Sequence, residues 1–195
     1  DRGTGYDIDG VIMANRAAGQ AATENLVPAG SKRIACITGP EHIETAAARI
    51  RPANELDLAN GREAGLSVGL QDRLRLDQAR LTALAAAVRE IIALPDPVGD
   101  VVRGSTLPNG VTLSQIRVPF GVIGAIYEAR PNVTIDIAAL ALKSGNATVL
   151  RGGTAAQHTN AVLVALIQEA LESVGLPGDA VQTIDEFGRE GATQL

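Results

Sequence analysis

Residues 117–153 read RVPFGVIGAIYEARPNVTIDIAALALKSGNATVLRGG. An apolar, β-branched run at 120–127 and a second apolar run at 147–150 predict two strands. Between them the spacing predicts a helix over 132–142, with Gly145 as its stop. Two strands joined by a helix of this length form a βαβ unit, and such units are almost always parallel with a right-handed crossover. This stretch therefore predicts a parallel α/β sheet.

Apolar periodicity continues the pattern toward the end of the sequence. It predicts a helix over 154–174, a third parallel strand over 180–184 and a helix that begins at 186. Helices that alternate with parallel strands cover both faces of the sheet. The predicted fold class is therefore α/β, with a doubly wound, mostly parallel sheet and helices on both faces.

Two helices and a hairpin are predicted before the central unit. The helices cover 54–61 and 72–94, and the second has its apolar residues near one face. The hairpin joins strands over 101–106 and 111–118 through the Asn-Gly pair at 109–110, because both residues accept positive φ. It adds one β-hairpin extension to the predicted sheet.

The composition limits the class of protein. Of 195 residues, 46% are hydrophobic but only 2% are aromatic, so Ala, Leu, Ile and Val must build the core. A net charge of −5 without a basic run predicts no nucleic acid partner and no anionic membrane partner. No apolar run approaches the roughly 18 residues of a membrane span, and no signal peptide opens the sequence. Cys36 is the single cysteine, so we expect no disulfide framework and a soluble protein of the reducing cytoplasm.

Several ordered motifs carry a family resemblance. They are LANGREAGLS at 58–67, DRLRLD at 72–77, LPDPVGDVVRG at 94–104 and LPNGVTLSQIRVPFGVIG at 107–124, followed by the rest of the central stretch to 153. Together they resemble the cofactor-binding half of γ-glutamyl phosphate reductase (glutamate-5-semialdehyde dehydrogenase), from about residue 54 to residue 195. So many matches in order over this length form a specific signal.

The resemblance implies an NAD(P)-binding-type α/β domain of an aldehyde-dehydrogenase-like reductase over 51–195. The family reduces γ-glutamyl phosphate with NADPH in proline biosynthesis, and the hydride chemistry belongs to the cofactor. Its catalytic cysteine belongs to a separate domain downstream of the residues present here. We therefore expect a cofactor-domain fragment that binds a dinucleotide weakly and does not turn over alone.

The first 50 residues differ from the expected start of that family. DGVIMANRAAGQAATENLV at 9–27 and KRIACITGPEHIETAAARIR at 32–51 resemble part of the effector-binding domain of lactose-repressor-type regulators. The DNA-binding helix-turn-helix of those regulators is missing here. We interpret residues 1–50 as a repressor-like α/β fragment packed on the rest, in a chimera joined near Arg51-Pro52. The alternative is a divergent natural amino terminus.

Local patterns divide these first residues into short elements. Strands are predicted over 8–13 and 33–38, and helices over 17–27 and 43–50.

The main candidate site is Arg151-Gly152-Gly153-Thr154, between a strand end and a helix start. Glycines there let backbone N–H groups approach a phosphate, and a helix amino terminus favours an anion. The alternative from spacing alone is a tight strand-to-helix turn, with Thr154 as the helix cap. The resemblance implies that this turn lies against the adenosine end of NADP, with Arg151 and Thr154 near the 2′-phosphate.

Glu128, Arg130 and Asn132 follow the first central strand and form a second candidate group. Asn132 either caps the helix or is an amide that lines the active-site cleft. Arg130 either binds an acidic substrate such as γ-glutamyl phosphate or forms a surface salt bridge.

The remaining chemically active residues predict neither catalysis nor metal binding. Cys36 lies in the strand IACIT and is best explained as a small buried residue. His42 and His158 lack metal-ligand spacing, which favours surface or capping roles. Lys143, near a helix carboxyl end, is placed to offset the helix dipole, and Asp136 suits the first turn of the same helix.

Three classes of function remain open at this point. The chain is an enzyme fragment, a repressor-type module for a small molecule, or a recombined or designed scaffold with no ligand. The hairpin and the last helix both expose apolar surface that a homo-oligomer would cover.

Overall fold

The computed structural model describes residues 40–195. The elements predicted over 8–13, 17–27 and 33–38, together with Cys36, lie outside the described residues.

Three parallel strands form the central sheet. They are β3 (Val122–Ile126), β4 (Ala147–Arg151) and β5 (Val181–Thr183), in the spatial order β3-β4-β5. The register runs from Val122 opposite Ala147 to Ile126 opposite Arg151, so β3 and β4 end at the same edge. The prediction of a parallel βαβ unit is confirmed.

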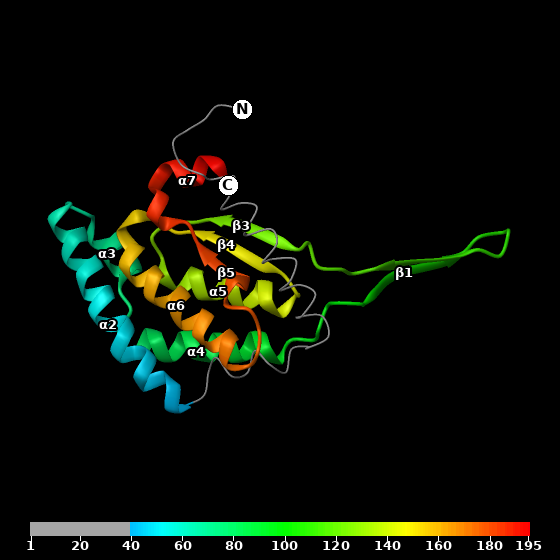
Figure 1. The fold of residues 1–195 in the computed structure, drawn as a ribbon, viewed down its shortest axis with the longest axis horizontal. Coiled ribbons are helices and arrows are strands. Elements are labelled where there is room, and N and C mark those ends of the chain that lie inside the picture. The colour runs from blue at the N-terminus through cyan, green and yellow to red at the C-terminus, as the bar shows by residue number, and fades with distance from the viewer. Residues whose placement is uncertain (1–39) are drawn as a thin grey trace.

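Helices form two layers on one side of this sheet (Figure 1). α5 (Pro131–Lys143) and α6 (Gln157–Ser173) lie next to the strands, and α2 (Pro40–Glu63) and α4 (Gln78–Ala93) lie beyond them. Between the strands and the inner helices lies a core made largely of aliphatic side chains, as the composition predicted; it includes Ala138, Leu142, Leu150, Val164, Ile167, Leu171 and Val181.

α7 (Gly188–Gln194) lies on the opposite side of the sheet from α5 and α6 (Figure 1). It follows the short turns η3 (Gly178–Ala180) and η4 (Asp185–Phe187), which flank β5. Among the described residues, no helix combines the length and the apolar character that crossing a membrane requires.

α2 is one continuous helix, although Pro52 lies inside it. The predictions of separate helices over 43–50 and 54–61 were therefore wrong. A proline removes one backbone hydrogen bond and normally kinks or ends a helix. Here the buried face continues past it, because Ala47, Ile50, Asn54 and Asp57 recur at helical spacing while Pro52 is exposed. Packing along that face outweighs the local cost.

The helix predicted over 72–94 is in fact two helices, α3 (Val68–Leu74) and α4. Asp77 caps α4, since its side chain accepts a hydrogen bond from the backbone N–H of Arg80 at 2.9 Å. The break is also held from α2, where the Asn54 carboxamide bonds the backbone of Leu74 and Leu76. Tertiary contacts thus divide a segment whose periodicity predicts one helix.

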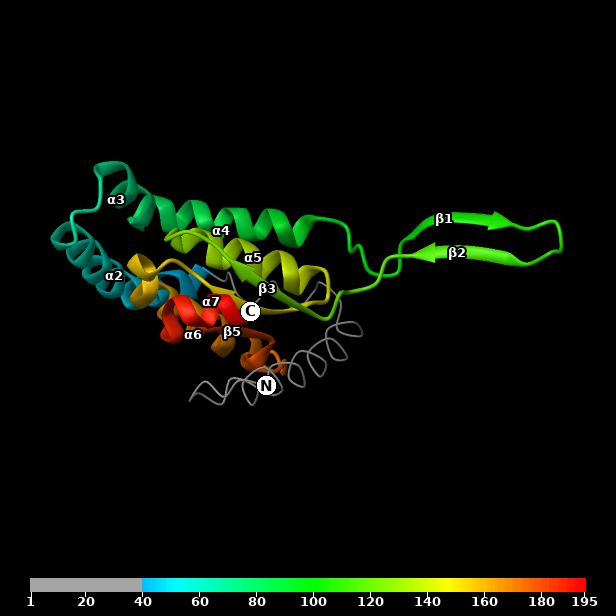
Figure 2. The same cartoon turned by 90° about the horizontal axis from the view of Figure 1, so that it is seen from above.

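The predicted hairpin is present as β1 (Val101–Thr106) and β2 (Thr112–Ile116), paired antiparallel. These two strands form a sheet of their own and project from the body as an arm (Figure 2). Every residue of both strands is exposed. In the turn only Gly110 has positive φ, at 85°, so Asn109 does not use the conformation that its type tolerates.

Candidate functional site

The candidate turn begins where β4 ends at the carboxyl edge of the sheet. Arg151 is only 7% exposed. Its Nε donates to the backbone carbonyl of Gly188 at 3.1 Å, and its Nη1 donates to the backbone carbonyl of Gly152. The guanidinium is thus bonded to the protein's own backbone, and its positive charge is buried between the turn and Gly188.

Gly152 and Gly153 allow three segments to meet at this turn. A Cβ on Gly153 would lie 2.5 Å from the backbone N of Ala129, in the loop after β3. A Cβ on Gly152 would overlap the side-chain amide of Asn160 and lie 3.2 Å from the ring of Tyr127. Close packing therefore requires both glycines, which supports the interpretation of a tight strand-to-helix turn.

The amino terminus of α6 is capped from another helix. Thr154 was predicted to cap it, but Thr154 begins the short turn η2 (Thr154–Ala156), and α6 starts at Gln157 without a local side-chain cap. Asp57 of α2 takes this role, accepting from the backbone N–H of Thr159 at 2.8 Å and of His158 at 3.3 Å. The prediction of Thr154 as cap was wrong, because a buried carboxylate 101 and 102 residues earlier already accepts from these donors.

A chain of side-chain hydrogen bonds joins the ends of all three strands. The hydroxyl of Tyr127, after β3, lies 2.7 Å from that of Thr134, which donates to Asn160 Oδ1 at 2.9 Å. Asn160 Nδ2 donates to Asp185 Oδ2 at 3.0 Å, after β5. Asp185 Oδ1 accepts from the backbone N–H of Gly152 at 2.7 Å, after β4. One polar network thus fixes the whole carboxyl edge.

Burial shifts the two ionisable groups of this network in the same direction. Loss of solvation raises the pKa of Tyr127 to about 12, so its phenol stays neutral. Burial also raises the pKa of Asp185 above its ordinary value, although the amide of Asn160 and the N–H of Gly152 oppose the shift by bonding the carboxylate. Each hydrogen bond to Asp185 therefore matters most when that group is ionised.

The second candidate group lies on the surface beside the turn. Glu128 is the partner of Arg130, at 3.4 Å from Nε, and of Arg73 on α3 at 3.6 Å. Arg130 occupies the cap position of α5 without a side-chain cap bond, and Pro131 is the first helical residue. Asn132 is inside the helix, 3.4 Å from Asp136, so its prediction as the cap was wrong. Pro131 suits the first helical position because the N–H that it lacks would have no partner there and its fixed φ is already helical.

Burial raises the pKa of Asp136 above its ordinary value, and the hydrogen bond from Asn132 opposes that rise. Lys143 is buried and donates to the carbonyl of Ile92 at 2.9 Å, at the carboxyl end of α4. Its ammonium therefore offsets the negative end of a neighbouring helix as well as its own. Within residues 40–195 no group of three or more His, Cys, Asp or Glu residues could hold a metal.

A separate pocket of about 340 Å³ lies between α2, α4 and α6. Its lining is largely aliphatic, and the ion pair between Arg49 and Glu169, at 2.6 Å, joins α2 to α6 within that lining. Its two charged lining residues are paired with each other, and the other polar lining residues are Thr45 and Ser173.

Asn54, Asp57, Asn160 and Asp185 are the residues that sequence reasoning missed. A weak signal existed for the first two, because they occupy positions three residues apart that continue the buried stripe of Ala47 and Ile50. Polar residues on a buried helical face are bonded to partners. Nothing local indicates that the partners of Asn54 lie 20, 22 and 105 residues away, or that those of Asp57 lie 101 and 102 residues away.

The fold and this edge of the sheet define a class of protein. The structure resembles a Rhodopseudomonas palustris propionaldehyde dehydrogenase with bound CoA, with a TM-score of 0.58 over 93% of this chain at 20% identity. At that identity the likeness shows the fold, which is that of aldehyde-dehydrogenase-like proteins. No family model matches the sequence.

The relatives of higher identity are γ-glutamyl phosphate reductases. The sequence is 64% identical over 180 residues to the γ-glutamyl phosphate reductase of Leifsonia xyli, covering 92% of this chain and 43% of the relative. It is 66% identical over 153 residues to that of Kineococcus radiotolerans, covering 78% and 35%. The solved structure of the Thermotoga maritima enzyme matches with a TM-score of 0.84 at 35% identity, over 93% of this chain and 44% of that one. The chain is thus similar to a portion of these γ-glutamyl phosphate reductases, and it spans less than half the length of each of them.

These comparisons bear on the predicted junction near Arg51-Pro52. An alignment that covers 92% of the chain must cross these two residues, and α2 runs through them without a break. The chimera interpretation therefore receives no support.

Proposed function

We propose that this chain is the cofactor-binding part of an NADPH-dependent γ-glutamyl phosphate reductase of proline biosynthesis. The observation that carries the proposal is that the ends of β3, β4 and β5 converge on residues 151–154 through one polar network. Ligands of open α/β sheets bind outside the carboxyl ends of the strands. The identity with the reductases supports this cofactor. Alone, the chain is expected to bind NADP without turnover.

The residues of the turn suit different parts of the task. Thr154 is exposed and Gly153 is partly exposed, so the hydroxyl and backbone there can reach the adenosine end of NADP. The buried guanidinium of Arg151 supplies positive charge next to the turn. The backbone N–H of Gly152 attaches the turn to Asp185. The N–H groups at the start of α6 bond Asp57, and the ligand therefore does not rely on them.

Arg130 and Asn132 are proposed to meet the acidic substrate. Both lie in the loop and first turn after β3, and the Arg130 side chain is 42% exposed. Binding an anion would require Arg130 to exchange Glu128 for the substrate. The Glu128 side chain is 70% exposed and Arg130 Nε makes no hydrogen bond to it, so the pair is weak enough for that exchange.

Titration with NADPH, followed by nucleotide fluorescence, tests the proposal. We expect a saturable change with a dissociation constant of roughly 0.1–1 mM, which corresponds to about 4–5.5 kcal/mol. Thr154→Val should weaken binding several-fold because a hydroxyl contact is lost, whereas Thr112→Val on the exposed arm should not. A signal that stays linear to millimolar cofactor would contradict the proposal.

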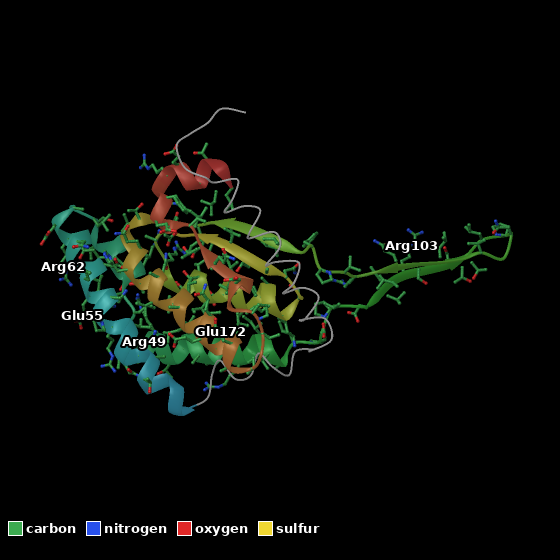
Figure 3. All side chains as sticks on the ribbon, viewed as in Figure 1. Arg49, Glu55, Arg62, Arg103 and Glu172 are labelled. Atoms are coloured by element: carbon green, nitrogen blue, oxygen red, sulfur yellow. The ribbon has the colours of Figure 1, made fainter. Side chains whose placement is uncertain are left out.

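We further propose that the arm joins a second copy of the chain. An isolated two-stranded hairpin is marginal in water. The arm nevertheless carries exposed apolar side chains, among them Val101 at 62%, Leu113 at 49% and Ile116 at 50% exposure. Figure 3 shows Arg103 on this arm, far from the helical body. Contact with a partner would cover this surface and stabilise the hairpin.

Sedimentation velocity checks this expectation. The wild type should have twice the mass of one chain. Leu113→Lys should shift the population toward the monomer by placing a charge in the contact, whereas Arg103→Lys retains its charge and should not. A monomeric wild type at all attainable concentrations would contradict the proposed dimer.

A further inference from the structure

The first turn of α6 is held by three parts of the chain at once. His158 and Thr159 bond Asp57 of α2. The next residue, Asn160, bonds Thr134 of α5 and Asp185 beyond β5. This turn follows the candidate site closely, because only Ala155, Ala156 and Gln157 separate Thr154 from His158.

Asp57 makes four contacts with this turn, and its side chain is only 2% exposed. Its Oδ2 accepts from the backbone N–H of Thr159 at 2.8 Å and from the hydroxyl at 2.6 Å. Its Oδ1 lies 2.7 Å from Nδ1 of His158 and accepts from the backbone N–H of that residue at 3.3 Å. A carboxylate at the positive end of a helix dipole is stabilised there, and ligand phosphates use the same position in other folds.

Asn54, one turn earlier on α2, extends the attachment. Its Nδ2 donates to the carbonyl of Leu74 at 2.9 Å and to the hydroxyl of Thr159 at 3.2 Å, and its Oδ1 accepts from the N–H of Leu76 at 2.7 Å. α2 therefore ties the start of α6 to the loop between α3 and α4. Every polar atom of the Asn54 carboxamide is used.

We propose that Asp57 is a positioning residue for the candidate turn at residues 151–154. Its carboxylate takes the place of a ligand anion at the start of α6, and it fixes where that helix begins relative to Gly152, Gly153 and Thr154. The effect on the ligand rests on the proposed cofactor function, but the effect on the turn does not. Asp57 does not contact the cofactor, and it acts through His158 and Thr159.

Amide hydrogen exchange of the full chain tests the positioning. In Asp57→Ala we expect exchange to rise about tenfold, the effect of losing a helix cap, at the amides of His158 and Thr159 and at that of Ala156, which donates to the carbonyl of Gly153. Exchange in the centre of β4 should rise much less. The control is Glu55→Ala, which removes the same charge from the exposed face of α2 (Figure 3) and should change neither region.

Chemical rescue separates positioning from general loss of stability. Acetate or formate added to Asp57→Ala can enter the position of the missing carboxylate, and should slow exchange at residues 154–159 and restore NADPH affinity toward the wild-type value. Chloride at the same ionic strength should not. If Asp57→Ala fails to fold, Asp57→Asn keeps the shape and one acceptor oxygen, and the same exchange pattern is expected with a smaller increase.

The outcomes distinguish this inference from the proposed function. Exchange that rises uniformly over the chain, or no change at residues 154–159, would overturn the positioning role. A wild type that binds no NADPH, with local exchange and acetate rescue as expected, would reject the cofactor function and leave the positioning of the turn established.

Discussion

Gly153→Ala is expected to destabilise the protein by about 3 kcal/mol or more, at the upper end of the cost of overpacking. The added Cβ would lie 2.5 Å from the backbone N and 2.9 Å from the Cα of Ala129. Backbone cannot rotate away as a flexible side chain can. The loop is also anchored, because Tyr127 N–H donates to the carbonyl of Arg151 at 3.0 Å.

Urea unfolding followed by circular dichroism measures this effect. Gly69→Ala is the matched control, since Gly69 lies in α3 and a Cβ there would meet nothing within 4 Å. Alanine is the better helix former, so the control should gain about 0.5–1 kcal/mol. A Gly153→Ala variant as stable as the wild type would show that the loops after β3 and β4 are not in close contact.

Asn160→Ala should cost about 3 kcal/mol at neutral pH, because it removes the partner of a buried carboxylate and of a buried hydroxyl. Asn160 is 1% exposed and lies between Thr134 and Asp185, each about 3 Å away. Water has little access to replace the lost amide. The neighbouring Gln157 is exposed, so Gln157→Ala should stay within about 0.5 kcal/mol of the wild type.

The effect should depend on pH in a defined direction. The Asn160 amide stabilises ionised Asp185 and so holds down a pKa that burial raises. Without it the folded-state pKa of Asp185 rises further above the unfolded value. The loss of unfolding free energy in Asn160→Ala is therefore largest above the folded-state pKa of Asp185. It shrinks as pH falls through that pKa, because protonated Asp185 no longer requires the Asn160 amide. Unfolding curves from pH 7 to pH 4 that keep a constant difference would contradict this account.

The sequence predicted those parts of the fold that local patterns determine. β-branched apolar runs bounded by Gly and Pro indicated β3, α5 and β4 to within two residues, and Gly145, with φ of 74°, follows the end of α5 as expected. The Asn-Gly pair likewise predicted the hairpin. In each case the residues that determine the element lie within it or directly beside it.

Where distant contacts decide, local patterns misled. Local patterns predicted separate helices over 43–50 and 54–61, but the face of α2 that packs on α6 continues through the residues between them. The run 72–94 suggested one helix, but the Asn54 carboxamide takes the backbone groups of Leu74 and Leu76 and so favours a break. Neither outcome follows from propensity, because the deciding partner is about 20 residues or more away.

The candidate site shows the same division. Arg151-Gly152-Gly153-Thr154 was predicted from its place between a strand and a helix, and the structure places it there. The groups that hold it come from α2, α5 and the end of β5, and no spacing in the sequence relates them. The carboxylate of Asp57 in particular cannot be assigned to α6 without the packing of the two helices.

The hydrogen bonds that fix His158, Thr159 and Asn160 to other parts of the chain limit the length of the segment between Gly153 and His158. Each residue added to a helix rotates the residues after it by about 100°. A single insertion between Gly153 and His158 would therefore turn all three side chains away from their partners together, and no shift of one neighbour could restore them. We expect the segment between Gly153 and His158 to accept substitutions at its exposed residues but to keep a fixed number of residues. At the exposed tip of the arm, by contrast, the number of residues is free to vary.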